Sequence, residues 1–178
     1  MVQKTILIKS LEKTFKKVEG LLHRNGFKTA TLESERALRK FIYETIPDNC
    51  IVGLGNSLSS SALKIRNILL EKGNKVYYNW NGLSQNRNMD TYEDMPRPDY
   101  FLTIADTITR DGSLINKEYS KEALKNYQLP KNIIAFTHPD KIKDKISQSG
   151  LSSDFTVLNK RTENSDVTVA LMHFASAS

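Results

Sequence analysis

The stretch that decides the fold is Ile51-Val52-Gly53-Leu54-Gly55-Asn56-Ser57-Leu58-Ser59-Ser60-Ser61. It begins as a short apolar strand, passes through two glycines, and continues into amide and hydroxyl side chains that precede an amphipathic helix. Gly53 and Gly55 have no Cβ, so the chain can turn sharply there and approach a ligand closely. Asn56 or Ser57 can cap the following helix, whose first N–H groups then point outward.

The start of that helix is a candidate anion site, because free N–H donors and the positive end of the helix dipole both favour negative charge. We therefore expect a phosphate or carboxylate to bind at Gly53, Gly55, Asn56, Ser57 and Ser59. The alternative is that the glycines only form a tight strand-to-helix turn. The three-glycine dinucleotide fingerprint and the lysine of a phosphate-binding loop are both absent, so the motif defines no nucleotide site.

Strands and helices alternate along the rest of the chain. Expected helices cover residues 3–25, 34–46, the segment from the glycine turn to 72, 117–127 and 138–149, and expected strands cover 27–31, 50–54, 75–80, 100–105, 132–137, 155–159 and 167–174. The strand at 50–54 is apolar on both faces, which is typical of a central strand covered by helices on both sides. The pattern predicts an α/β fold with a mainly parallel central sheet flanked by helices, formed by residues 1–178 as one domain.

Composition and cysteine content exclude several classes of protein. The chain is 39% hydrophobic and 26% charged, which is ordinary for a globular protein. No apolar run approaches the length of a membrane span, and no signal peptide is evident, so we expect a cytoplasmic protein without a membrane partner. The single cysteine, Cys50, suits a reducing compartment. The three histidines have no metal-ligand spacing, so we expect no metal and no cofactor.

The net charge of +6 admits a polyanionic partner. The lysines are spread along the chain, however, and no nucleic-acid-binding motif of the usual kinds is present. We therefore interpret them as solvated helix faces and do not favour a nucleic-acid partner. A basic patch gathered on one face of the folded protein would favour one.

A second polar loop follows the expected strand at 100–105. Ligands of parallel sheets bind beyond the carboxyl ends of the strands, so we expect Thr109 and Asp111 to share one crevice with Gly55 and Ser57. Asp111 is the candidate general base, because burial can tune a carboxylate to take up a proton. The alternative is that Asp111-Gly112 is a hairpin turn whose aspartate bonds its own backbone.

Three further residues are candidates for ligand binding. Gly112 and Ser113 lie in the same turn, where the serine hydroxyl can donate to a ligand oxygen. Lys141 lies at an expected helix start and is either an anion-binding cation or a solvated charge. The sequence leaves the oligomeric state open.

Three blocks of the sequence together resemble the LUD (lactate utilisation) domain family. The first is Val52 to Ser59, where the family tends to show Gly-Gly-Ser with a hydroxyl two residues on. The second is Pro98 to Ala105 with Ile108 to Asn116, where the family reads Ala-Asp-x-x-Leu-Thr and then Ile-Thr-x-Asp-Gly-Thr-Leu. The third is Pro130 to Phe136, followed by Lys141-Ile142. The blocks span residues 50 to 142 in this order, and on this resemblance we expect a short, stand-alone member of the family.

The resemblance implies a fold like that of the sugar-isomerase and coenzyme A transferase superfamily. It also implies a link to the bacterial oxidation of L-lactate to pyruvate, beside iron–sulfur partner proteins. The family usually has an Asp after its Thr-Leu strand; Glu118 stands nearest to that position and is the second catalytic candidate. The family's Gly-Asn-Arg is replaced here by Ser120-Lys121-Glu122, and the cysteine-rich region of some members is missing.

An enzymatic role is the alternative interpretation. Gly53-Leu54-Gly55-Asn56-Ser57 also resembles the phosphate loop of ribose-5-phosphate isomerases, and Asp111-Gly112 faintly resembles their catalytic Asp-Gly. Their glycine-rich lysine loop is absent. The sequence therefore leaves two functions open: an accessory protein that binds a small anion, and an enzyme of the sugar-phosphate isomerase or acyl-coenzyme A transferase type.

Overall fold

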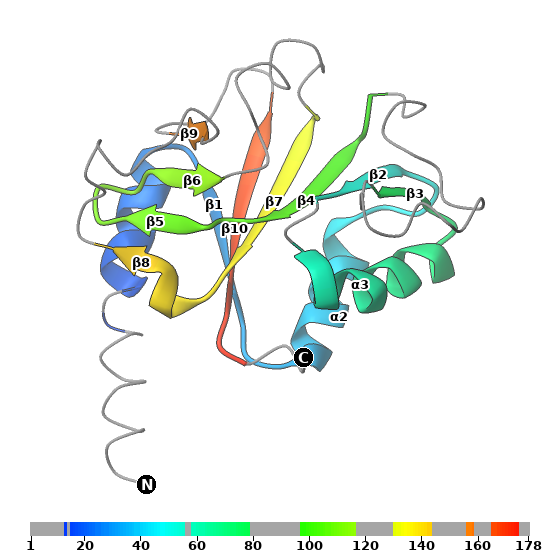
Figure 1. Cartoon of the computed structure of the whole chain (residues 1–178), viewed down its shortest axis with the longest axis horizontal. Coiled ribbons are helices and arrows are strands. Elements are labelled where there is room, and N and C mark those ends of the chain that lie inside the picture. The colour runs from blue at the N-terminus through cyan, green and yellow to red at the C-terminus, as the bar shows by residue number, and fades with distance from the viewer. Residues whose placement is uncertain are drawn as a thin grey trace, which may run out of the picture.

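The centre of the protein is a six-stranded sheet with the order β1-β10-β7-β4-β2-β3 (Figure 1), and all neighbouring strands in it are parallel. The computed structural model describes residues 13, 15–55, 58–78, 97–116, 130–143, 156–158 and 165–174. The strands of the central sheet are β1 (Lys28–Leu32), β2 (Ile51–Leu54), β3 (Lys75–Tyr78), β4 (Tyr100–Ile104), β7 (Asn132–Thr137) and β10 (Asp166–Met172). The predicted α/β fold with a mainly parallel sheet is confirmed.

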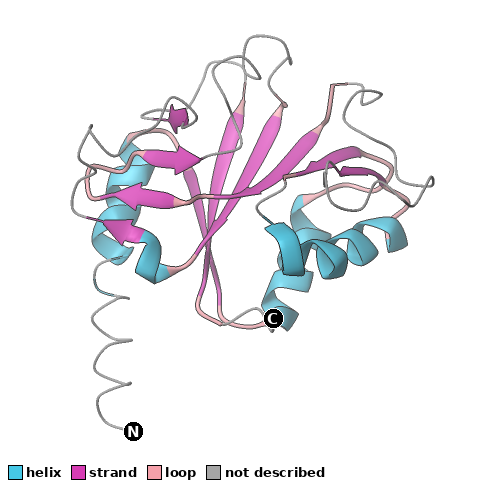
Figure 2. Cartoon of the chain, viewed as in Figure 1, coloured by secondary structure: helices cyan, strands magenta, loops and turns pink. Residues whose placement is uncertain are grey.

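The sheet is apolar on both faces, as the sequence of its strands predicts. Successive residues of β7 illustrate this, because Ile134 and Phe136 belong to one buried cluster while Ile133 and Ala135 belong to the other. The first cluster is closed by α2 (Glu35–Thr45) and α3 (Ser59–Glu71). The second is closed by the helical residues 15–24 and by a smaller sheet (Figure 2). The central sheet therefore lies between two covering layers.

The smaller sheet has the order β8-β5-β6-β9. Its strands are β5 (Thr107–Thr109), β6 (Leu114–Asn116), β8 (Ile142–Lys143) and β9 (Thr156–Leu158). The predicted hairpin is confirmed, since β5 and β6 are antiparallel and Gly112 between them has a φ of 83°. The residues expected as a strand at 155–159 contribute β9 to this sheet, not to the central one.

The expected helix at 138–149 is wrong in its described part. Only a 3-10 turn, η3 (Pro139–Lys141), forms there, and the chain then enters β8. Pro139 supplies a φ suited to a helical turn, but Ile142 and Lys143, which follow η3, pair with β5 instead of continuing a helix. This pairing lets Ile142 pack against the apolar cluster under the small sheet, which a continued helix would not allow.

Glycines end two of the helices where the sequence places their ends. Gly26 and Gly73 have φ values of 83° and 74°. In the first case the N–H of Phe27 donates to Leu22 O at 2.9 Å and that of Gly26 to His23 O at 2.9 Å, which is the Schellman pattern. At the N-terminus of α2, the Ser34 hydroxyl accepts from Ala37 N at 3.1 Å. The expected helix at 117–127 lies outside the described residues, as do residues 3–12 of the first helix.

The order of the strands reverses beside β2. After β2, the chain forms β3 beside it on one side. It then crosses over and forms β4 on the other side of β2, followed outward by β7 and β10. In open parallel sheets, ligands bind beyond the carboxyl ends of the strands at such a reversal. The carboxyl ends of β2 and β4 are therefore the place to look for a site. Over the described part of the chain, none of the helices has the length and apolarity needed to cross a bilayer.

Candidate functional site

The chain leaves β2 through a tight, buried turn. β2 and β4 pair with Leu54 opposite Leu102, and the Gly55 N–H continues this ladder by donating to Leu102 O at 2.8 Å. The Gly55 carbonyl in turn accepts from Leu58 N at 3.2 Å. Gly53 and Gly55 are both buried. The Gly55 N–H is therefore already bonded within the sheet, and any donors to an anion must come from the residues after it.

The start of α3 has no side-chain cap from its N-cap residue. That residue is Leu58, which is apolar and buried, and the first turn of α3 contains no acidic residue. Asn56 or Ser57 was the expected cap, and both residues lie outside the described part of the chain. Ser59 is the first residue of α3. Among the described residues, the N-cap position therefore supplies no side-chain acceptor to the early N–H groups of α3.

The residues expected as a second half of the site form a self-contained turn. The Asp111 carboxylate accepts from the Thr109 hydroxyl and from the Ser113 N–H, the latter at 3.4 Å. The Ser113 N–H also approaches Thr109 Oγ1 at 3.1 Å. The Thr109 hydroxyl, and after it the Ser113 N–H, lowers the pKa of Asp111 below its usual value. A general base at neutral pH needs a raised pKa, so this geometry favours the turn interpretation of Asp111.

The turn sits against the first helix and not against the glycine turn. Asn25 Nδ2 donates to the carbonyls of Asp111 at 3.2 Å and Gly112 at 3.1 Å. Figure 1 shows the β5–β6 hairpin extending away from β2 and α3, toward the helical residues 15–24. The two loops do leave neighbouring strands at the same edge of the sheet. The hairpin nevertheless carries Thr109 and Asp111 away, so the structure does not bring them together with Gly55.

Lys141 also lies apart from the glycine turn. It is exposed on η3, in the layer that contains the hairpin, where Arg110 N donates to Lys143 O at 3.0 Å. Glu118, the second catalytic candidate, lies outside the described residues. Of the candidates, the structure thus groups Thr109, Asp111, Gly112 and Ser113 in one turn and places Gly53, Gly55 and Ser59 in another.

A buried polar group at the ends of β4 and β7 was missed by the sequence reasoning. The Asn116 amide donates to Thr103 Oγ1 at 2.7 Å and to Ile104 O at 2.8 Å, and both side chains are buried. The hydroxyl of Thr137, which is also buried, donates to the Ala105 carbonyl at 3.4 Å. Polar residues at the ends of apolar strands are the sequence signal for such a group. These bonds tie the small sheet to the carboxyl edge of the central sheet.

Two histidines at the same edge were also treated as unrelated. His138 follows β7 and His173 follows β10, and these strands are neighbours with Thr137 opposite Leu171. Both side chains are half-buried. The two histidines are far apart in the sequence, so the sequence alone does not show that the strands before them end side by side. Among the described residues, no group of three or more metal-ligating side chains comes together.

Fold and site define a parallel α/β protein with a candidate anion site at the strand-order reversal. The sequence profile of the LUD domain matches residues 15–150, and the chain belongs to the LUD domain family. It is similar to the crystal structure of a DUF162 family protein from Deinococcus radiodurans, with a TM-score of 0.60 and 12% identity, over 91% of this chain and 98% of that one. At that identity the likeness shows the fold alone. No curated protein matches the chain.

Proposed function

We propose that this protein is an accessory component of bacterial lactate utilisation that binds a small anion at the carboxyl edge between β2 and β4. The anion is a carboxylate or a phosphate, and L-lactate is the first candidate. Family membership supports the link to lactate, since the family takes its name from that process.

The observation that carries the proposal is the start of α3. Its N-cap residue, Leu58, offers no side-chain acceptor, and no carboxylate of the first turn neutralises the helix dipole. Both features favour an external anion over an internal one. The position also coincides with the reversal of strand order, where open parallel sheets bind their ligands.

The redox chemistry of lactate oxidation is assigned to partner proteins. Conversion of lactate to pyruvate removes two electrons, which an iron–sulfur protein can accept. An iron–sulfur cluster needs several thiolates, and this chain has only Cys50. Cys50 also directly precedes β2, at the amino end of the sheet, and burial raises the pKa of its thiol. We therefore propose that this protein binds or presents a ligand while iron–sulfur partners carry the electrons.

The alternative enzyme is less well supported. An isomerase or acyl-coenzyme A transferase would need a carboxylate base or nucleophile at the anion site. Asp111 is held by its own turn, with a lowered pKa, at the far end of the hairpin. None of the contacts in the described part of the chain favours isomerase or transferase activity over anion binding alone.

The proposal is tested by the melting temperature in the presence of anions. Sodium L-lactate, pyruvate and phosphate are compared with sodium chloride at equal ionic strength. A ligand selective for the folded state stabilises it by mass action, by about 2.7 kcal/mol at a hundred times its Kd. We expect at least one of the three anions to raise the melting temperature in a saturable manner.

Two variants that change the net charge equally give the control. Ser59→Asp places a carboxylate in the first turn of α3, so it should stabilise the free protein by about 0.3 to 1 kcal/mol while abolishing the gain from the anion. Lys141→Ala also lowers the net charge by one but leaves α3 unchanged, and it should keep the gain. If both variants lose the gain equally, the effect is general electrostatics and the proposal is wrong.

A further inference from the structure

Cations without ion pairs gather on one layer of the protein. Lys13, Lys16, Lys17 and Arg24 project from the first helix, and Lys141 and Lys143 from η3 and β8. All of these side chains are exposed, and none forms an ion pair with another residue that the structure describes. Val18 and Leu22 of the helix and Ile142 of β8 meet in one apolar cluster, so the helix and β8 belong to the same layer. We call these six cations the basic layer.

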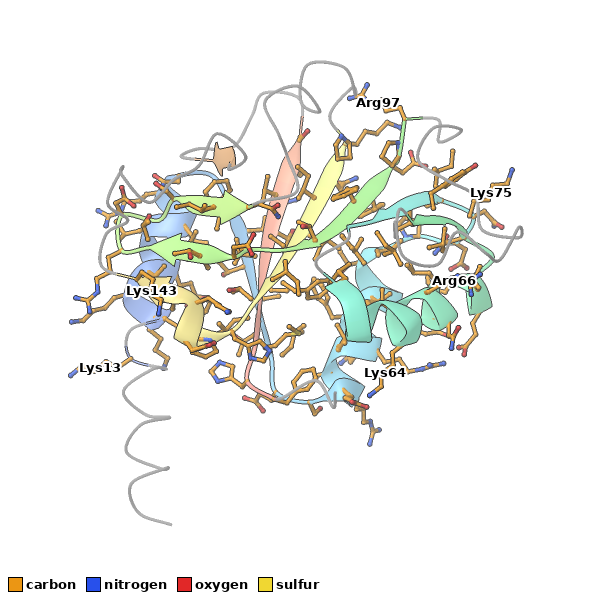
Figure 3. The ribbon with its side chains drawn as sticks, viewed as in Figure 1. Lys13, Lys64, Arg66, Lys75, Arg97 and Lys143 are labelled. Carbon is orange, nitrogen blue, oxygen red and sulfur yellow. The ribbon has the colours of Figure 1, made fainter. Side chains whose placement is uncertain are left out.

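The helix presents its cations in a single outward stripe. Phe15, Val18 and Leu22 point into the core. Lys13, Lys17 and Arg24 are spaced by four and seven residues, which places them together on the opposite side of an α-helix. The stripe is about 16 Å long, from the eleven steps between Lys13 and Arg24 at a rise of about 1.5 Å each. Lys143 lies on the same side of the molecule as Lys13 in Figure 3.

The opposite layer is different, because its cations are largely neutralised. Arg39 pairs with Glu71, and Lys64 pairs with Glu35 at 2.5 Å. Lys72 likewise pairs with Asp48 at 2.7 Å. The remaining described cations without a pair, Arg36, Arg66 and Lys75, are separate from the basic layer; Figure 3 shows Arg66 and Lys75 on the far side from Lys13. Among the described residues, the basic layer thus holds more cations without an ion pair than the opposite layer, although Glu19, Asp111 and Asp140 also lie in it.

The side chains of the basic layer favour a phosphate-rich surface as its binding partner. The large hydrophobic side chains that are exposed among the described residues are Tyr43 and Leu70, and both belong to the opposite layer. Among its described residues the basic layer has no exposed aromatic side chain on which the bases of a single strand could stack. What the described residues do offer is positive charge, and lysine is depleted in stable protein interfaces whereas phosphate groups attract it.

We infer that the basic layer binds double-stranded nucleic acid through the phosphate backbone, without reading its sequence. A duplex presents one negative charge per about 1.7 Å of its axis, and flexible lysine side chains reach such phosphates as point charges. The binding is independent of the anion site at α3, which lies on the other side of the central sheet from the first helix.

The test is fluorescence anisotropy of the full chain with labelled duplex DNA of two unrelated sequences, over a range of salt concentrations. Both duplexes should bind with equal affinity, with a Kd of about 1 to 100 μM. The slope of log K against log salt should be steeper than about −3, since each phosphate neutralised contributes about −0.9.

Two triple variants remove the same charge from different layers. Lys13→Gln with Lys17→Gln and Arg24→Gln should weaken binding roughly tenfold or more and reduce the slope by about 2 to 3 units. Arg36→Gln with Arg66→Gln and Lys75→Gln should change both values little. Circular dichroism melts confirm that these exposed substitutions leave the fold intact.

Three results would overturn the inference. They are equal losses in the two triple variants, the absence of duplex binding by the wild-type protein at low salt, and binding to vesicles of anionic phospholipid with no binding to duplex.

Discussion

The buried amide of Asn116 provides a sharp test of how the two sheets are held together. This side chain is 5% exposed and lies at the end of β6, from which it donates both of its amide hydrogens to β4. Replacing it with leucine keeps a similar volume and removes both donors. The buried Thr103 hydroxyl and the partly buried Ile104 carbonyl then each lose one hydrogen bond.

The magnitude follows from the cost of a buried polar group that lacks its partner. The lost bond costs about 1 to 3 kcal/mol at the buried Thr103 hydroxyl and about 1 kcal/mol at the partly buried Ile104 carbonyl, so Asn116→Leu should lower the free energy of unfolding by about 2 to 4 kcal/mol. Thr103→Val removes one of the two acceptors in advance. The cost of Asn116→Leu should then fall by about 1 kcal/mol, which is the coupling between the two side chains.

Urea unfolding followed by circular dichroism measures these values for the wild type, the two single variants and the double variant. An unchanged dependence on urea would show that the variants unfold from equally compact states. A cost of Asn116→Leu below about 1 kcal/mol, with no coupling to Thr103→Val, would refute the role assigned to this amide.

Two further predictions concern an acid-sensitive contact and a matched pair of glycines. The Ile51 N–H, and after it the Lys131 side chain, donate to the Asp99 carboxylate and lower its pKa in the folded protein. The ionised Asp99 therefore stabilises the fold at a pH above the pKa that this group has in the unfolded chain. This stabilisation is lost as the pH falls through the lower pKa of the folded protein. Asp99→Asn should therefore cost about 1 kcal/mol in urea unfolding at neutral pH, and this difference should shrink below about pH 4; a pH-independent difference would contradict it. Gly112→Ala should cost at least about 1 kcal/mol, because φ is 83° and a Cβ would lie 3.1 Å from the Leu21 backbone. Gly20→Ala, where a Cβ meets nothing within 4 Å in a helix, should instead stabilise the protein by about 0.5 to 1 kcal/mol, and melting temperatures that move in the same direction for both would contradict the pair.

Much of the central sheet was predictable because its strands carry local signals. β2, β4 and β7 are apolar on both faces, and glycines or a serine cap mark the ends of the neighbouring helices. Gly26 and Gly73 follow the helix ends that the sequence indicated. These features depend on residues close in sequence, which is why they can be recognised without the fold.

The small sheet was predictable only in its β5–β6 hairpin, because its other strands are short and pair over long distances. β8 has two residues, and its partner in β5 is more than thirty residues earlier, with Ile108 opposite Ile142. No period is visible in so short a strand. The same sheet displaces the hairpin with Asp111 from the glycine turn, so the composition of the candidate site could not be read from the order of motifs. The glycine turn itself was placed correctly at the carboxyl end of β2.

The measurement that tests the central claim most directly is an amide-resolved NMR titration with L-lactate and with phosphate. If an anion binds at the start of α3, the backbone amides of residues 55–61 should shift first and saturate together, because donors to an anion are the groups whose environment changes most. The hairpin amides of residues 109–113 should remain unchanged at the same concentrations. Saturating shifts confined to the hairpin, or no saturating shift at the start of α3 with either anion, would contradict the account.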